Sequence, residues 1–512
     1  MSKKSKKITR DDIIKDYINC NNDYFRTTKK MTIPRAIYRL RSKIPENLVR
    51  KYFGGLTALR KAADEKQALY SRFTSEITDK GGKKQRYIVT SIVEGAPINR
   101  DFYSALKLYC EKNNAKLLML WMRGVLKTDM FSKDDMAEYK KYLFTEFKFN
   151  NTLRAKDFLL YPAQQLPLTG LDRFGSKKTS LIVASTKQMM TSIPRPKGET
   201  PHVIWTTGTV STPEYSKTRN GALASQDNTL GALIVEVESD KKFYIRNVEW
   251  IDDCFVDLGK AYYSNKVKNI ACEALVWGDL HSQEIDKISL EKAIEQTNYL
   301  KAQRIFIHDL ISFNSISHHN EGKYLTKTFI PHEVNTLRKE LDTAKQLLHY
   351  IHKSIKSDII VVQSNHDDFL YRYCDEGRFL KDAHNAILGA ECFIKYTKKL
   401  NPIEDYMNMK YITFLKPDES YKVLGIETGQ HGHHGANGAI GSPNGFRKSY
   451  DKIVLGHSHQ PKIVNNVYYV GTLSKLILAY NKGSSSWLPA NCAIYKNGSR
   501  QLLIWIDNKW KM

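Results

Sequence analysis

Five short polar clusters between Trp277 and Pro461 carry the residue types that bind divalent metal ions. Together they supply Asp, Asn and several His, without any Cys. Such a mixed set of oxygen and nitrogen donors suits Mn²⁺, Fe²⁺ or Zn²⁺. In chain order, the clusters are Gly278-Asp279-Leu280-His281, His308-Asp309, Ser364-Asn365-His366-Asp367, His431-Gly432-His433 and Gly456-His457-Ser458-His459.

The number of donors exceeds what one four-coordinate ion can use. A carboxylate shared between two ions about 3.5–4 Å apart is the simplest way to engage them all, and it is the arrangement of two-metal phosphoryl-transfer sites. The clusters therefore predict a site that holds two divalent ions and hydrolyses a phosphate ester.

Each cluster follows a short apolar run that predicts a strand. Runs of about four apolar residues between helical patterns are typical of strands buried on both faces. Polar residues at the exits of successive strands would meet at one edge of the sheet, where α/β proteins build their sites. The runs are Ala274–Trp277, Ile305–Ile307, Ile359–Val362, Val423–Ile426 and Ile453–Leu455.

The order of these motifs resembles the calcineurin-like metallophosphoesterase superfamily, and the strongly basic chain with its basic helical extension has the general look of the double-strand-break-repair (SbcD-type) nucleases within it. The shared pattern is Asp-x-His, a later Asp, Asn-His-Asp, a His-Gly after a strand, and Gly-His-x-His, over roughly residues 271–480. The resemblance implies a β-sandwich flanked by helices.

The resemblance also implies a role for each matching residue. His366 corresponds to the catalytic histidine beside the leaving oxygen, and Asp367 to the carboxylate that orients it. Two ions follow, with Mn²⁺ expected and Fe²⁺, Zn²⁺ or Mg²⁺ as alternatives, and a hydroxide that bridges them attacks phosphorus. One ion is assigned to Asp279, His281, Asp309 and His459. The other is assigned to Asp309, Asn365, His431 and His457, with Asp309 as the bridge.

The chain departs from the family pattern in the second and third motifs, and its fourth motif is ambiguous. Ser312 stands where the second motif usually ends in Asp or Glu, and Ser364 replaces the Gly of the third. In the fourth motif, His431, His433 and His434 are all within ligand reach. We interpret His431 as the ligand because it comes first after the strand and precedes Gly.

Further histidines are candidates for contact with the substrate. His318 and His319 lie in the loop after Asp309, where related nucleases carry polar residues near the substrate phosphate. A solvated loop is the alternative. We also expect His433 to contact the substrate.

Charge points to a polyanionic partner. The 512 residues carry a net charge of +25, and residues 1–60 hold 16 Lys and Arg against 5 Asp and Glu, a net of +11. Such basicity favours nucleic acid, with a solvated lysine surface as the alternative. The first 83 residues show short helical patterns that resemble small helix-turn-helix modules, and Arg35, Arg39 and Arg41 are their candidate DNA-binding residues.

The chain as a whole is expected to contain three domains. Residues 1–83 form a basic helical domain, residues 84–270 an α/β middle domain of unreadable role, and residues 271–512 the metallophosphoesterase domain. The middle begins with a βαβ pattern formed by Arg86–Val93, Phe102–Asn113 and Lys116–Met122. This layout also resembles the pre-early host-DNA-degrading nucleases of T5-like bacteriophages.

The expected function is therefore hydrolysis of DNA phosphodiester bonds. A phosphatase or small-molecule phosphodiesterase is the alternative among enzymes, and a DNA-binding scaffold with an inert phosphoesterase fold is the alternative outside them. No apolar run approaches the roughly 20 residues of a membrane helix, and the seven scattered cysteines indicate a reducing compartment. We expect a homo-oligomer in the cytoplasm, or in the host cytoplasm if a phage encodes the chain.

Overall fold

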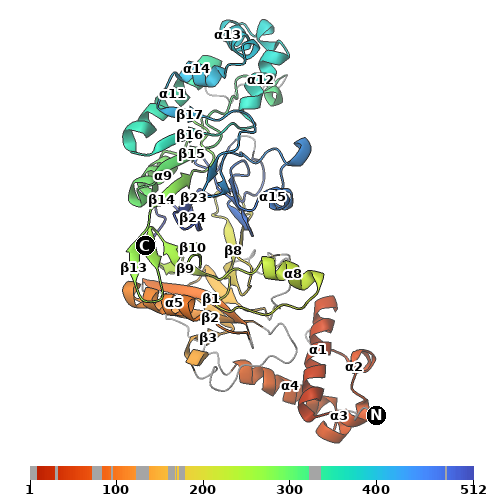
Figure 1. Cartoon of the computed structure of the whole chain (residues 1–512). Coiled ribbons are helices and arrows are strands. Elements are labelled where there is room, and N and C mark those ends of the chain that lie inside the picture. The colour runs from red at the N-terminus through yellow and green to blue at the C-terminus, as the bar shows by residue number, and fades with distance from the viewer. Residues whose placement is uncertain are drawn as a thin grey trace. The chain divides into compact units, whose positions relative to one another are not determined.

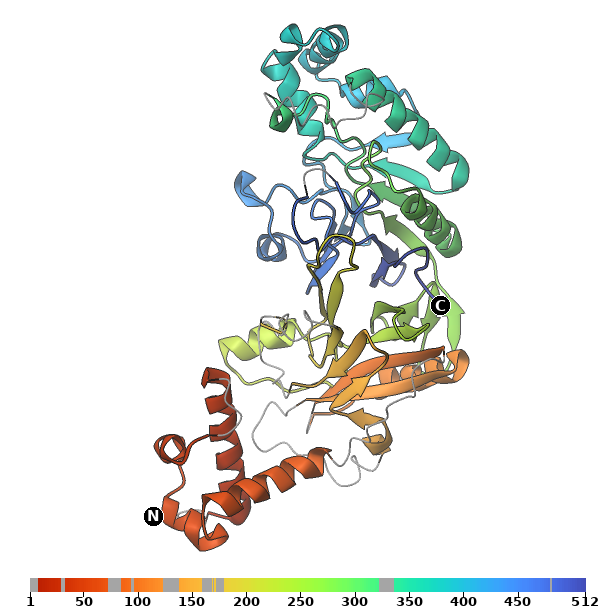
Figure 2. The same cartoon turned by 180° about the vertical axis from the view of Figure 1, so that it is seen from behind.

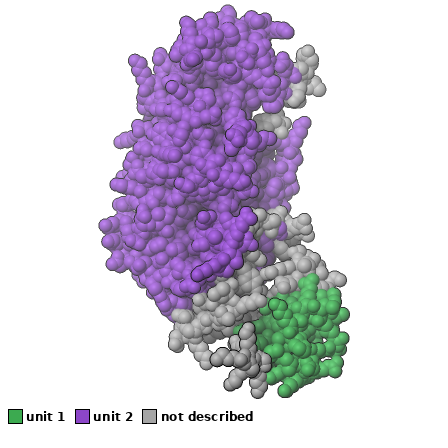
Figure 3. Space-filling model, turned by 45° about the vertical axis from the view of Figure 1, so that its right-hand side comes forward, with its two compact units in different colours: residues 1–77 green, residues 78–512 purple. Residues whose placement is uncertain are grey.

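The computed structural model describes residues 8–28, 33–71, 84–93, 96–122, 138–158, 168, 170–171, 179–321, 336–478 and 481–512. Contacts divide the chain into two compact units, residues 1–77 and residues 78–512 (Figure 3). The boundary expected after residue 83 falls at the edge of a segment outside the described residues.

Unit 1 is helical, as its sequence predicts. Thr9 caps the first helix: the Asp12 N–H donates to Thr9 Oγ1 at 3.2 Å, and the Thr9 N–H donates to Asp12 Oδ2 at 2.9 Å. A small core that includes Ile13, Tyr38 and Leu59 holds the unit together. The helices are α1 (Arg10–Thr28), α2 (Arg35–Arg41), α3 (Glu46–Phe53) and α4 (Leu56–Ser71).

Unit 2 contains a six-stranded sheet with helices on one face (Figure 1). The order is β17-β16-β15-β14-β23-β24, in which β14 to β17 are parallel and the β23–β24 hairpin is antiparallel. This hairpin turns at Asn497-Gly498. The strands are β14 (Cys272–Val276), β15 (Arg304–Ile307), β16 (Asp358–Val361), β17 (Ile412–Phe414), β23 (Ala490–Tyr495) and β24 (Arg500–Ile504).

Alternate residues of each strand in this sheet enter different cores. Leu275 and Ile305 pack against helices, whereas Val276 and Phe306 face a second sheet. The apolar stripe of α11, which includes Leu341 and Leu348, lies in the helical core, so this stripe is part of the interior. The covering helices are α9 (Lys287–Leu300), α11 (Leu337–Ser354), α12 (Asp367–Asp375), α13 (Ala386–Thr397) and α14 (Pro402–Met407).

The facing sheet has ten strands and joins both sides of the boundary expected at residue 270. Its order is β18-β19-β20-β22-β21-β7-β8-β6-β5-β4, and β21 pairs antiparallel with β7. The two sheets share one core, so the fold is a mixed α/β structure with a β-sandwich. The strands are β4 (Glu146–Lys148), β5 (Leu153–Lys156), β6 (Ser180–Val183), β7 (Met189–Ile193), β8 (His202–Thr206), β18 (Lys422–Val423), β19 (Ile426–Glu427), β20 (Ile453–Leu455), β21 (Lys462–Val464) and β22 (Val467–Tyr469).

One predicted strand is wrong in form. The run Val423–Ile426 is a tight hairpin between β18 and β19, with Leu424 and Gly425 both at positive φ (51° and 77°). Two central residues at positive φ make the two-residue turn that antiparallel strands favour. Because the run was predicted from its apolar content alone, the turn at Leu424 and Gly425 was not recognised.

The remaining sheets belong to the middle of the chain (Figure 2). The predicted βαβ pattern is confirmed, because β1 and β2 pair in parallel on either side of α5. In the described residues, no helix combines the length and the apolar character needed to cross a membrane. The five-stranded sheet contains β1 (Gln85–Val93), β2 (Ala115–Met122), β3 (Leu143–Phe144), β9 (Gly231–Val237) and β10 (Phe243–Glu249), and the three-stranded sheet contains β11 (Phe255–Asp257), β12 (Lys260–Tyr262) and β13 (Val267–Asn269). The helices of this part are α5 (Arg100–Asn113) and α8 (Arg219–Gln226). A further helix, α15 (Pro443–Ser449), lies later in the chain.

Candidate metal centre

The five polar clusters follow the carboxyl ends of β14, β15, β16, β19 and β20. The first three strands belong to the six-stranded sheet and the last two to the ten-stranded sheet. The clusters therefore meet where two sheets face each other, whereas the sequence predicted one sheet edge. This difference arises because the spacing of the apolar runs along the chain does not predict which sheet each strand joins.

Four of the predicted ligands sit on backbone in the left-handed region. Their φ angles are 46° at His281, 46° at Asp309, 70° at His457 and 53° at His459. Non-glycine residues rarely adopt this conformation, and each instance costs on the order of 1 kcal/mol. The fold therefore imposes the direction of these side chains at the expense of local backbone energy.

A glycine makes room for the first carboxylate. A Cβ at Gly456 would lie 2.3 Å from Asp279 Oδ1 and 2.8 Å from the ring of His308. The next residue along, His457, donates its backbone N–H to the same Asp279 oxygen at 3.1 Å. Only glycine at position 456 lets the β20 loop approach the carboxylate this closely.

The first group of ligands surrounds Asp309. His281 Nε2 and His459 Nε2 lie 2.9 Å apart, and they lie 3.5 Å and 4.0 Å from Asp309 Oδ2. Asp279 Oδ2 is 3.2 Å from His459 Nε2. Ligands of one ion with bonds of about 2.1 Å lie roughly 3.0–3.5 Å apart, so these atoms are spaced to share one ion.

The second group lies on the other side of the same carboxylate. His431 Nε2 is 3.4 Å from Asp309 Oδ2 and 2.9 Å from Asn365 Oδ1, and His457 Nδ1 is 3.1 Å from the same Asn365 oxygen. Asp309 thus belongs to two candidate metal groups, one with His281 and His459 and one with Asp279 and His431. Asp279, which the resemblance assigns to the ion of His281 and His459, therefore lies within reach of both groups. This arrangement brings together all seven residues that the sequence assigned as ligands.

Two buried carboxylate oxygens in this centre have no hydrogen-bond donor among the described residues, namely Asp279 Oδ2 and Asp309 Oδ1. Both side chains are 1% exposed or less. Burying an unsatisfied charged oxygen is costly unless a cation or donor compensates it. The oxygen and nitrogen donors present therefore fit a divalent cation.

Burial also sets the protonation of the centre. It raises the pKa of Asp279 well above its ordinary value, with a further contribution from the charge of Asp309. Burial lowers the pKa of His308 to about 3 and that of His457 to about 4, and it lowers the pKa of His431 as well. Neutral imidazole is the form that binds metal.

Two of the ring nitrogens that point away from the centre, those of His281 and His431, have partners. His281 Nδ1 lies 3.3 Å from Ser312 Oγ, which itself donates to Glu284. His431 Nδ1 lies 3.4 Å from His308 Nδ1. Contacts of this kind hold the ring and tautomer of metal-ligating histidines. Ser312 thus connects the ring of His281 to the carboxylate of Glu284.

The contacts of His366 differ from those that the resemblance implies. His366 Nδ1 lies 2.7 Å from the carbonyl oxygen of Ser312, and its ring centroid is 4.9 Å from that of His281. Asp367 instead accepts the Ser364 N–H at 2.8 Å, and burial raises its pKa to about 7. In this structure the carbonyl of Ser312 orients the ring, and Asp367 fixes the turn that carries it.

The three candidate histidines of the fourth motif separate into two sets. His431 lies beside Asp309, whereas His433 and His434 group with Asp368. His433 Nε2 is 3.4 Å from Asp368 Oδ2. The geometry favours His431 as the ligand of the central pair.

His318 and His319 lie beside a shared aromatic ring. Both pack against Phe369, with centroids 5.3 Å and 5.6 Å away, and His366 packs against the same ring at 4.8 Å. The two histidines are thus one side chain away from His366, which is compatible with a contact to the substrate.

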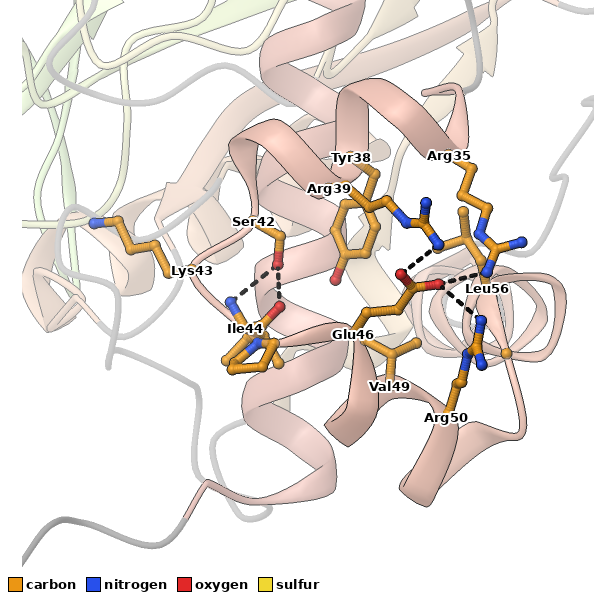
Figure 4. Close-up of a pocket in the computed structure, with 12 residues that line it drawn as sticks. Arg35, Tyr38, Arg39, Ser42, Lys43, Ile44, Glu46, Val49, Arg50 and Leu56 are labelled. Carbon is orange, nitrogen blue, oxygen red and sulfur yellow. Dashed lines mark hydrogen bonds and ion pairs between the residues drawn. The ribbon is translucent and has the colours of Figure 1, made fainter.

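The candidate DNA-binding arginines lie in unit 1, and two of them, Arg35 and Arg39, line a cavity of about 350 Å³ (Figure 4). Arg35 and Arg39 both pair with Glu46, and Arg50 lies 3.7 Å from the same carboxylate. Hydrogen bonds from Arg39 and then Arg35 lower the pKa of Glu46 to about 2. Arg41, at the end of α2, is exposed and does not line this cavity.

Several residues near the centre had no assigned role before the structure. Ser312 and Glu284 support His281, and Trp487 packs on His459 with centroids 4.3 Å apart. Asp368 was identifiable as the second carboxylate of the His-Asp-Asp run after Asn365. No local pattern indicated Trp487 or Glu284.

The fold and this site define an α/β protein with a buried His/Asp centre that could hold metal ions. No protein-family model matches the chain. The chain is 28% identical to protein A1 of Escherichia phage T5 over 467 residues, an alignment that covers 83% of each chain. It is thus similar to a T5 phage protein over most of its length.

Proposed function

We propose that this chain is a two-metal phosphodiesterase of the calcineurin-like metallophosphoesterase superfamily and that its substrate is DNA. The observation that carries the proposal is that Asp309 belongs to both buried ligand groups. A shared carboxylate between two ions is the arrangement that enzymes use for in-line phosphoryl transfer. The order of the five motifs along the chain supports the superfamily.

In such a centre, two divalent ions activate a water and neutralise charge that develops on the phosphoryl oxygens. The protein's own contribution is placement. Asp309 fixes the spacing of the two ligand groups, and the positive-φ backbone at His281 and His459 aims their rings at it. Burial of these side chains strengthens every charge interaction at the centre.

His366 is placed to act on the leaving group. Because Nδ1 is held by the carbonyl oxygen of Ser312, Nε2 is the nitrogen that can face the substrate. A proton on Nε2 would pass to the leaving oxygen or stabilise its charge. His318 and His319, across Phe369, would contact a flanking phosphate.

The charge of the chain supports DNA as the substrate. Residues 1–60 carry a net charge of +11. Within this segment, three arginines surround the single carboxylate of Glu46, so this cluster alone has a net charge of +2 (Figure 4). Phosphate contacts of Lys and Arg dominate affinity for DNA. The similarity to a T5 phage protein and the resemblance to phage nucleases of host DNA point the same way. We also propose that the protein assembles as a homo-oligomer and acts in the host cytoplasm.

Cleavage assays with matched substrates test the proposal. Purified protein is incubated with Mn²⁺ and circular plasmid, linear plasmid, a p-nitrophenyl phosphodiester or a p-nitrophenyl phosphomonoester. We expect hydrolysis of both plasmid forms or of the linear form alone, together with the small diester. Hydrolysis of a p-nitrophenyl monoester without cleavage of DNA would identify a phosphatase, and no hydrolysis at all would identify an inert scaffold.

A truncation tests whether unit 1 serves DNA binding. Each phosphate contact steepens the salt dependence of duplex affinity by about 0.9 in log–log slope. If a third of the basic residues in positions 1–60 contact phosphates, removal of residues 1–83 flattens that slope by several units. Hydrolysis of the small diester is the internal control and should hardly change. An unchanged slope would assign unit 1 to another partner.

A further inference from the structure

A third cluster of metal-ligating side chains lies outside the two groups that share Asp309. It consists of Asp368, His433 and His434, each of which offers one ligand atom within 4.8 Å of the others. His433 Nε2 and Asp368 Oδ2 are 3.4 Å apart. Two ligands with bonds of about 2.1 Å at a tetrahedral angle lie roughly 3.4 Å apart, so this pair has the spacing of ligands on one ion.

The imidazole of His433 is the strongest sign that the cluster binds something. Its side chain is only 11% exposed, yet neither ring nitrogen has a hydrogen-bond partner among the described residues. A buried polar group without a partner is rare in folded proteins and costs on the order of 1–3 kcal/mol. A cation between His433 and Asp368 would give Nε2 a partner.

The carboxylate is held in the direction that such an ion requires. Asp368 lies in the first turn of α12, and its Oδ1 accepts a hydrogen bond from Gln363 Nε2 at 2.8 Å. Its other oxygen, Oδ2, is therefore directed to His433. Supporting hydrogen bonds to a ligating carboxylate are typical of metal sites.

The loop that carries the two histidines is closed on itself. The Gly441 N–H donates to the carbonyl oxygen of His433 at 3.0 Å, and His434 forms a β-bridge with Ile440. A Cβ at Gly441 would lie 2.0 Å from the carbonyl oxygen of Gly432. The backbone of His433 and His434 is thus fixed before any ligand arrives.

We propose that Asp368, His433 and His434 form a third divalent-metal site beside the central pair. Two imidazoles and one carboxylate suit Mn²⁺, Fe²⁺ or Zn²⁺ and leave coordination positions open. The His433 ring is 5.4 Å from that of His431 and 6.1 Å from that of His457, so the site adjoins the central ligands. Asp368 is 47% exposed and His434 is exposed, so the open positions face solvent.

This placement gives the third ion a role in substrate binding, which rests on the proposed function. A polyanionic strand whose reacting phosphate lies at the central pair would bring a neighbouring phosphate oxygen to the open positions. The third ion would then strengthen binding of nucleic acid more than binding of a small diester, which has no second phosphate. The cluster would therefore increase the affinity for long DNA relative to the affinity for a small diester.

Metal content tests the proposal directly. The full chain is dialysed against Mn²⁺ or Zn²⁺ alone, and bound metal is measured by elemental analysis. We expect three ions per chain in the wild type, two in His434→Ala and in Asp368→Asn, and one in Asp309→Ala. His352→Ala, which removes an exposed histidine on α11 that stacks on Tyr411, is the matched control and should keep three.

The same series distinguishes failure of this site from failure of the proposed function. Two ions in the wild type and no loss in His434→Ala or Asp368→Asn would overturn the third site while leaving the central pair intact. Metal content that does not change in Asp309→Ala would instead overturn the central pair. In kinetics, we expect His434→Ala to raise KM for long DNA by roughly tenfold and to leave KM for the p-nitrophenyl diester unchanged. Equal effects on both substrates would contradict the phosphate role.

Discussion

The substitution Gly456→Ala tests how closely the β20 loop must approach the metal centre. The added methyl group would lie 2.3 Å from Asp279 Oδ1, about 1 Å short of ordinary van der Waals contact, which begins near 3.4 Å. It would also lie within 2.9 Å of the Cβ of His308. Either the carboxylate of Asp279 or the loop that carries His457 must therefore move by about 1 Å.

A displacement of this size has a large kinetic effect. Misplacement of a reacting group by about 1 Å costs on the order of 10²-fold in rate. We expect Gly456→Ala to lose at least that factor in kcat for the small phosphodiester and to bind Mn²⁺ more weakly. The assay is initial-rate kinetics across a Mn²⁺ titration, with metal content measured on the same samples.

Gly445→Ala is the matched control for this prediction. Its added methyl group would meet only Ser442 Oγ, at 3.1 Å, in a short helix away from the ligands. We expect this control to keep wild-type kinetics and metal content. If Gly456→Ala also kept both within threefold, the close packing of the loop on Asp279 would not matter to the centre, and the reasoning would be wrong.

Three further predictions concern chemistry, stability and pH. His366→Ala should keep its bound metal, measured by elemental analysis, and lose about 10²–10⁴-fold in rate, the usual contribution of a positioned acid; loss of metal would make His366 a ligand. Arg246→Met should lower the free energy of unfolding in urea by about 3–5 kcal/mol, because it removes the guanidinium that pairs with the buried Asp257 and Glu236, of which Glu236 keeps its ion pair with Arg86; a loss below 1 kcal/mol would contradict this. Burial raises the pKa of Glu340 from 4.5 to about 8, so its proton stabilises the fold fully below pH 4.5 and this contribution is lost as the pH rises through 8. Between pH 5 and 8 the wild type should therefore lose about 3–4 kcal/mol of unfolding free energy that Glu340→Gln keeps, and parallel pH profiles of the two proteins would contradict the assignment.

The elements that carry the candidate ligands were predictable because their signals are local. The strands β14, β15, β16 and β20 are continuous apolar runs that end at polar clusters, and the structure has each of them within a residue or two of its expected bounds. A buried strand with such a run can be predicted from its own residues, without knowledge of the strand with which it pairs. The helices of unit 1 were predictable for the same reason, from caps and glycine stops.

The features that the sequence did not predict depend on contacts between distant segments. The orientation of His366 by Ser312 joins residues 54 positions apart, and the pairing of β7 with β21 joins strands from opposite sides of the boundary expected at residue 270. The β18–β19 hairpin was missed because Leu424 adopts positive φ, which no residue preference signals for leucine. The division of His431 and His433 between two groups follows from the position of Asp368, on another element.

The most direct test of the central claim compares the wild type with Asp309→Ala for bound Mn²⁺ and for cleavage of DNA. If Asp309 is shared by two ions, the variant should lose two ions per chain and all measurable turnover of both linear DNA and the p-nitrophenyl diester. Its fold should be retained, as judged by circular dichroism. An Asp309→Ala protein that keeps its Mn²⁺ and cleaves at near wild-type rate would contradict a two-metal centre built on this carboxylate.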